Sequence, residues 1–142
     1  MFPELGPNVC TNHTTITHAI LARWPATTAR TLKEIGYGYI GSWALAKRIP
    51  EPEGPVFDLG GGWGTMANAI ADRHGVDVDV VDLEPVVNAA PPTHDQVNFH
   101  SGSALDATTW PSDRDYDGAV LSYLFSSVPG STHGHVLDGL QD

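Results

Sequence analysis

The residues whose types and spacing most clearly suggest a binding site form a glycine-rich segment near the middle of the chain. Asp58, Gly60, Gly62 and Gly64 fit the spacing DxGxGxG between a short apolar run and a helical pattern. Such glycines permit a tight turn, let the backbone approach a ligand, and leave helix N–H groups free for an anionic group. Thr65 stands where the GxGxxG pattern needs its last glycine, and no Lys-Ser or Lys-Thr pair follows as in a P-loop. The segment predicts a site for a nucleotide-like ligand, which we favour over a purely structural turn.

A second acidic residue, Asp82, stands 18 residues after Gly64, at the end of the next predicted strand. A carboxylate in that place can accept hydrogen bonds from both hydroxyls of a ribose. The alternative is that Asp82 only caps the helix that follows. We favour ribose binding, because the glycine-rich segment lies in the matching position.

Alternating strands and helices are expected to position these residues. Apolar runs predict strands at 55–59, 76–83, 97–100 and 116–124, and helical spacing predicts helices at 65–74, 84–90 and 133–140. Earlier in the chain the spacing predicts helices at 14–24, 27–35 and 40–49, the last with Trp43, Ala44 and Leu45 facing a core. We therefore expect an α/β fold with a parallel Rossmann-like sheet at 51–142, preceded by an arm and helical segment at 1–50.

The segment Asp58-Leu59-Gly60-Gly61-Gly62-Trp63-Gly64 resembles motif I of class I, Rossmann-like methyltransferases, and the residues around Asp82 are similar to a later segment of their small-molecule O-methyltransferases. The resemblance implies S-adenosylmethionine as the cofactor. Asp58 and the glycines, Gly61 among them, would contact its methionine part, and Trp63 would point toward the cofactor or the substrate entrance. Asp82 would hold the ribose, and Leu83 would lie against the adenine.

Two positions depart from that family's pattern. Ser103, followed by Ala104, stands where the family has an aspartate that reaches the adenine amino group. A serine hydroxyl can still bond the adenine, but without a charge, so both residues stay among the expected cofactor contacts. Ser126 stands at the position of the family's general-base histidine, and serine has no useful proton affinity near neutral pH. His133 and His135 are weak alternatives, because solvated helix residues are the favoured interpretation, and the catalytic base stays unassigned.

The composition narrows the class of function further. Its 17 acidic and 7 basic residues give a formal net charge of −10, which would repel nucleic acid and anionic lipid. No apolar run is long enough to span a membrane, and the first residues do not resemble a secretory signal. The single cysteine, Cys10, suits a cytoplasmic protein and is too few for a thiolate metal site, so no metal is expected.

The predicted strands give the order 3-2-1-4, whereas the family's sheet has further strands 5, 7 and 6. The sequence thus looks truncated after strand 4, and its apolar strand at 117–123 would form an edge prone to association. We expect a partner at this edge, either a second polypeptide that supplies the missing strands or a second copy of this chain, and activity only in such an oligomer.

Three functions remain open from the sequence. The first is an S-adenosylmethionine-dependent methyltransferase, or the cofactor-binding subunit of a split one, acting on a small natural-product-like molecule. The second is a non-catalytic partner that completes or regulates another chain. The third is a methyltransferase fold repurposed for another biosynthetic reaction.

Overall fold

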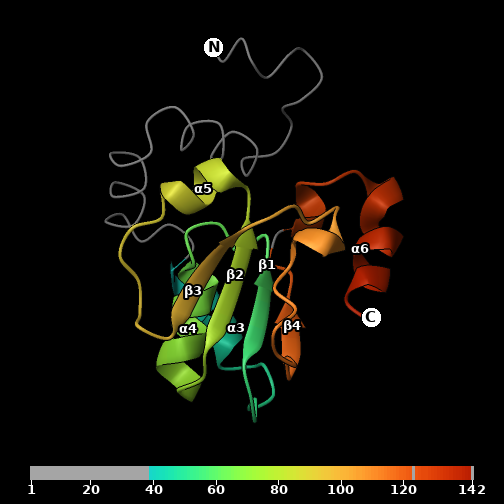
Figure 1. Cartoon of the computed structure of the whole chain (residues 1–142). Coiled ribbons are helices and arrows are strands. Elements are labelled where there is room, and N and C mark those ends of the chain that lie inside the picture. Colours follow the sequence, from blue (N-terminus) through green and yellow to red (C-terminus); the bar gives the residue numbers. More distant parts are fainter. Residues whose placement is uncertain (1–38, 123, 142) are drawn as a thin grey trace.

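The chain forms one parallel sheet, seen in a computed structural model that describes residues 39–122 and 124–141 (Figure 1). Its strands are β1 (Val56–Leu59), β2 (Val78–Asp82), β3 (Val97–Ser101) and β4 (Gly118–Val120). They lie in the order β3-β2-β1-β4, and every neighbouring pair is parallel. This confirms the predicted Rossmann-like sheet and its strand order. The register places Asp58 of β1 beside Val80 of β2, so both strands end at the same edge of the sheet.

Helices and short 3-10 turns connect the strands. The helices are α3 (Tyr39–Ala46), α4 (Thr65–His74), α5 (Glu84–Asn88) and α6 (His133–Gly139), and the 3-10 turns are η2 (Ala107–Thr109), η3 (Leu124–Ser126) and η4 (Gly130–Thr132). In Figure 1, α5 lies beyond the end of β2, and α6 lies on the β4 side of the sheet. No helix in the described part of the chain is long and apolar enough to cross a membrane.

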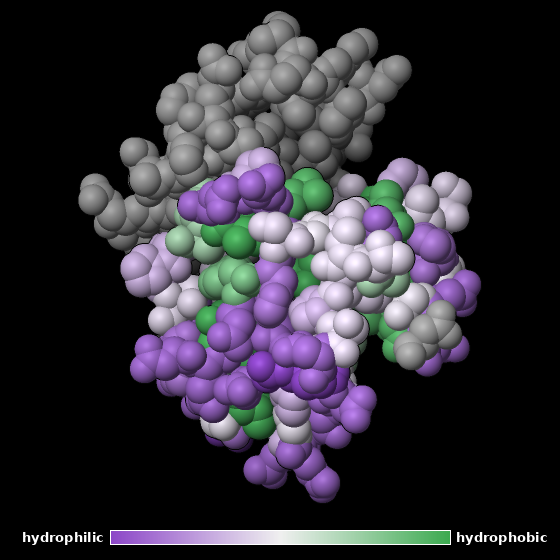
Figure 2. Space-filling view, viewed as in Figure 1, coloured by the Kyte–Doolittle hydropathy of each residue, from purple (hydrophilic) through white to green (hydrophobic). Residues whose placement is uncertain are grey.

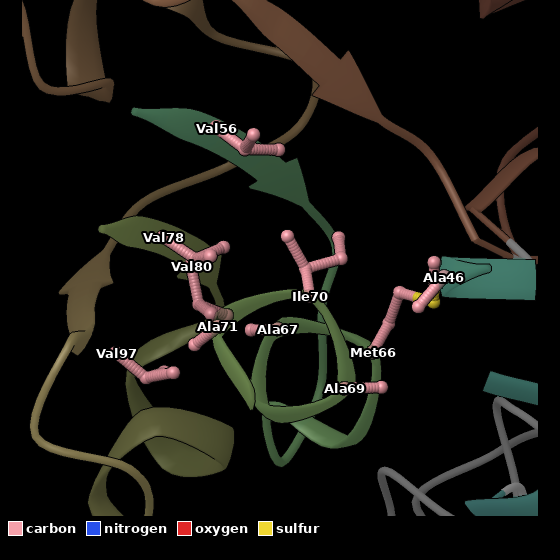
Figure 3. Packing of buried hydrophobic residues seen from close by; sticks show 10 residues of the cluster. All are labelled: Ala46, Val56, Met66, Ala67, Ala69, Ile70, Ala71, Val78, Val80 and Val97. Atoms are coloured by element: carbon pink, nitrogen blue, oxygen red, sulfur yellow. The ribbon is translucent and has the colours of Figure 1, made fainter. Parts of the chain in front are cut away.

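Helix α4 covers one face of the sheet, as its sequence pattern predicts. Figure 3 shows the inner side of this helix packed against the strands, with Ile70 and Ala71 near Val78 and Val80. The helix ends at Gly75, whose φ of 68° lets its N–H donate to the carbonyl of Ala71. The buried face therefore fixes α4, and with it the direction of the loop that enters the helix.

A second cluster of buried hydrophobic residues covers the other face of the sheet. Phe57, Leu59 and Val81 of the strands pack there with Leu124 and with Val136 of α6. The rings of Trp110 and Tyr116, from the β3–β4 connection, lie 5.5 and 5.2 Å from the ring of Phe57. This connection contains only the short η2, so side chains from a loop cover the sheet where a helix could have done so.

Four polar side chains surround a buried carboxylate on this second face. Asp79 accepts hydrogen bonds from the Tyr116 hydroxyl (2.7 Å) and the Asn98 amide (3.1 Å), and it pairs with His100 (3.3 Å) and Arg114 (3.5 Å). Burial acts to raise the pKa of Asp79, but these partners outweigh it and hold the pKa below its usual value. Figure 2 shows hydrophilic side chains gathered over the strands on the viewed face.

Two sequence predictions are wrong in detail. Trp43 and Leu45 of α3 are 43% and 44% exposed and Ala44 is exposed too, while Ala46 is buried and makes the contact with the core. The aromatic ring of Trp43 instead lies 3.4 Å from the Lys47 ammonium, a cation–π contact at the surface.

The fourth strand is also shorter than predicted. It pairs with β1 only over Gly118–Val120, and Leu124 already belongs to η3. The edge is thus short, which lowers its tendency to associate. The helices predicted at 14–24 and 27–35 lie outside the described residues.

Candidate functional site

Three glycines give the segment between β1 and α4 its shape. Gly60, Gly62 and Gly64 have φ angles of 72°, 60° and 76°, a left-handed conformation that side chains disfavour. A Cβ at Gly60 would lie 2.7 Å from Cδ1 of Leu124, and one at Gly64 would lie 2.8 Å from Cζ of Phe99. A Cβ at Gly62 would meet no atom of the described residues within 4 Å. Side chains therefore crowd two of these glycines, and within the described part of the chain the third has open space beside its backbone.

Asp58 lies beneath this loop and is completely buried. A Cβ at Gly61 would lie only 2.6 Å from its Oδ2, so the loop backbone lies directly against the carboxyl group. No donor of the described residues reaches hydrogen-bond geometry with either carboxyl oxygen. Burial raises the pKa of Asp58 to about 7, the charge of Asp82 adds to the rise, and the nearby backbone N–H of Ala67 opposes it.

Asp82 holds the loop from the end of the neighbouring strand. Its Oδ2 accepts the N–H of Gly62 at 2.8 Å, and its Oδ1 accepts the N–H of Leu83 at 2.7 Å. The side chain is 5% exposed, and each ionised oxygen has a second lone pair for a further donor. The N-cap of α5 is Leu83, so Asp82 stands one residue before the cap and bonds the N–H of that residue.

Leu83 and the segment after β3 lie beside Asp82. Leu83 is 51% exposed, although it directly follows the buried Asp82. The N–H of Gly102 donates to the carbonyl of Asp82 at 2.9 Å, which ties the Ser103–Ala104 turn to the same edge of the sheet. The hydroxyl of Ser103 accepts the N–H of Leu105 at 3.2 Å. The structure thus brings the predicted contacts from β1, β2 and β3 to one edge.

Trp63 faces the protein rather than an open surface. Its side chain is 8% exposed and packs with Val86 of α5 and with Ala89 just after it. The indole therefore supports α5 over the end of the sheet, and a direct contact with a ligand stays a prediction.

The two histidines are held by backbone carbonyls. His133 stacks on Phe125 with ring centroids 4.4 Å apart, and its Nε2 lies 3.3 Å from the carbonyl oxygen of Val128. Nε2 of His135 lies 3.1 Å from the carbonyl oxygen of Leu105. Both contacts require a proton on Nε2, which leaves only Nδ1 to accept a proton. The backbone of Ser126 ends η3, and its side chain lies outside the described residues.

Leu124 and Phe99 are site residues that the sequence analysis missed. Each contacts a glycine of the loop from a distant part of the chain, and neither belongs to a motif. The only available signal was apolar character at the ends of predicted strands. In the described part of the chain, no three His, Cys, Asp or Glu side chains gather so that they could hold a metal ion.

The sequence itself matches no protein-family model and no curated protein. Solved structures do resemble the fold. Human N-acetylserotonin methyltransferase, in complex with S-adenosylmethionine, has a TM-score of 0.64 at 20% identity over 86% of this chain and 36% of its own. The mitomycin 7-O-methyltransferase MmcR has a TM-score of 0.64 at 16% identity over 84% and 37%.

A third similar structure is a complex of the Haloferax volcanii Trm112 methyltransferase activator with a methyltransferase. It matches with a TM-score of 0.59 at 22% identity over 87% of this chain and 53% of that chain. This chain spans about a third of the length of the two O-methyltransferase-like structures. The described chain therefore has the Rossmann-like fold of S-adenosylmethionine-dependent methyltransferases.

Proposed function

We propose that this chain binds S-adenosylmethionine and serves in methyl transfer to a small molecule. The observation that carries the proposal is the open side of Gly62. Its N–H donates to Asp82, and a Cβ there would meet no atom of the described residues within 4 Å. Backbone free of side chains beside a buried acceptor is the arrangement that a nucleoside ligand needs. The buried carboxyl of Asp58, unpartnered among the described residues, also fits a ligand that carries positive charge.

Each predicted contact has a role in this proposal. The free lone pairs of Asp82 accept the ribose hydroxyls, exposed Leu83 lies against the adenine, and Ser103 offers a hydroxyl to its edge. The glycine loop takes the methionine part. The cofactor supplies an electrophilic methyl group, so the protein mainly has to orient the acceptor and exclude water. The solved structures that support this include two methyltransferases whose names specify small-molecule substrates, N-acetylserotonin and mitomycin.

We further propose that the chain acts with a partner. The sheet of the described residues ends at β4, whose outer side pairs with no strand. A second polypeptide, or a second copy, would add strands there and supply the catalytic base. The Haloferax volcanii structure supports this, since a methyltransferase there is bound to an activator. A non-catalytic role beside an active partner is the second candidate, because the expected base position holds Ser126 and both candidate histidines already contact backbone carbonyls.

Calorimetric titration of the full chain with S-adenosylmethionine tests cofactor binding. Gly62→Ala and Gly75→Ala are matched variants, because both glycines have left-handed φ angles (60° and 68°) and a Cβ at either would meet no described atom within 4 Å. Each should lose about 1 to 2 kcal/mol of stability through backbone strain. Only Gly62→Ala should also weaken binding, and equal affinities in the two variants would contradict the proposed site.

Sedimentation and a methyl-transfer assay test the partner. Ala119→Lys places a charge on exposed β4 and should block pairing at that edge while leaving cofactor binding intact. If the purified chain alone methylates an acceptor as a monomer, both the partner proposal and the non-catalytic alternative fail.

A further inference from the structure

Helix α3 buries one side against α4 and leaves its opposite side apolar. Its last residue, Ala46, is completely buried and lies beside Met66 of α4 (Figure 3). Trp43 and Leu45 are 43% and 44% exposed, and Ala44 between them is exposed as well. Successive residues of an α-helix are rotated by about 100°, so Ala44 lies nearly opposite Ala46 and the two large side chains flank it. The outer side of α3 is therefore an apolar surface with its smallest residue in the middle.

The sequence directly before α3 carries another short helical pattern. The helix predicted at 27–35 has apolar residues at Ala29, Leu32 and Ile35, a spacing of three that places them along one side. A helix this short is not stable alone in water, so the segment needs a surface to pack against. Only residues 36–38, two of them glycine, separate it from α3. Connections of this length join helices that lie antiparallel and side by side.

Charge favours this segment over a second copy of the chain as the group that covers α3. Residues 1–38 hold three of the seven basic residues and only two of the 17 acidic ones, which gives them a net charge of +1. Residues 39–142 hold the rest and have a net charge of −11. Two whole chains, each with a net charge of −10, repel one another, whereas the segment and the acidic remainder attract. The short connection also keeps the segment at a high effective concentration beside α3.

We propose that residues 27–35 form a helix that packs antiparallel on the outer side of α3. This helix lies over Ala44, whose small side chain lets the two helix axes approach closely, and Trp43 and Leu45 fill the spaces on either side. Helix α3 is then covered by α4 on one side and by the segment on the other, which accounts for its apolar residues on both. The packing is independent of cofactor binding, so either proposal can fail alone.

Urea unfolding of the full chain in a double-mutant cycle tests this packing. Leu32 and Trp43 stand at similar distances from the connection, so their side chains are expected to meet. Leu32→Ala and Trp43→Ala should each lower the ratio of folded to unfolded chain by about fivefold or more, because each removes buried apolar area. In the double variant the second change should cost clearly less, because its partner is already gone. Loss of the Lys47 contact with Trp43 occurs in both arms and cancels. Leu137→Ala is the matched control, since Leu137 is a helical leucine that is 44% exposed on α6, and its effect should add to that of Leu32→Ala.

Repeating the cycle at several protein concentrations, with sedimentation of each variant, identifies what covers α3. Coupling between Leu32 and Trp43 that does not change with concentration supports packing within one chain. A neutral Leu32→Ala, or strict additivity with Trp43→Ala, overturns the proposal, because alanine favours a helix that packs against nothing. A dimer that dissociates on Trp43→Ala but not on Leu32→Ala also overturns it, because a second copy would then cover this side of α3.

Discussion

The buried carboxyl of Asp58 predicts an unusual pH dependence of stability in the ligand-free chain. The pKa of this carboxyl rises from 3.8 to about 7 on folding. Between those two values the folded chain binds more protons than the unfolded chain, so the free energy of unfolding falls as pH rises. The fall ends above about pH 7, where both states have lost the proton.

The magnitude follows from the same two values. Integrated linkage gives a loss of about 2 to 3 kcal/mol between about pH 5 and about pH 8 from this single residue. Asp58→Asn keeps the size of the side chain and removes the charge. The free energy of unfolding of the variant, relative to wild type, should therefore be higher by that amount at the higher pH than at the lower one. The gain arises because wild type must either bury an unpaired charge or partly open the loop to hydrate it.

Urea unfolding at several pH values measures this prediction, with the midpoint and slope fitted at each. The difference between Asp58→Asn and wild type isolates Asp58 from the other groups that titrate over the same range. Exposed Asp72→Asn serves as the matched control and should show no such difference. A stability difference that is constant from acid to alkaline pH would refute the reasoning, because it would mean that Asp58 is ionised throughout.

Two other predictions concern the contact between Gly60 and Leu124 and the hydrogen bond between Tyr116 and Asp79. Gly60→Ala should destabilise the chain by about 2 kcal/mol or more, because backbone strain adds to a 2.7 Å contact between the new Cβ and Leu124. In a double-mutant cycle, Leu124→Ala in the same chain should recover part of that loss. Strictly additive losses of stability would contradict the contact. Tyr116→Phe should cost about 1 to 2 kcal/mol near neutral pH by removing the 2.7 Å hydrogen bond to Asp79. The pKa of Asp79 is lowered in the fold, so this contribution is present above pH 3.8 and lost as pH falls below it, and thermal unfolding in acid should show the variant approaching wild type.

Local sequence patterns predicted the strands and the loop because their causes are local. The apolar runs, the glycine spacing and the inner face of α4 each follow from neighbouring residues, and Asp58 and Asp82 lie at the predicted strand ends. The outer face of α3 was predicted wrongly, because only the contact with α4 decides that Ala46, and not Trp43, is buried. The length of β4 is set by its pairing with β1, which ends at Val120, and the run of apolar residues gives no sign of where that pairing ends.

Parts of the site were beyond prediction for the same reason. The packing of Leu124 against Gly60 and the polar contacts around Asp79 join residues far apart in sequence, and no spacing rule connects these residues. The environment of Trp63 depends on how α5 folds back over the loop. Motifs could name which residues gather at the edge of the sheet, but not which of them are buried, bonded or left without a donor.

The contact between Leu124 and Gly60 links the two regions for which this chain has separate proposals. Leu124 begins η3, just beyond the edge strand β4, and its side chain occupies the space that a Cβ at Gly60 would need. Close-packed atoms transmit displacement instead of absorbing it. A partner that docked against β4 and moved η3 would either press on the Gly60 turn, the proposed cofactor site, or leave a void beside it. The conformation of this loop should therefore respond to what binds at the sheet edge.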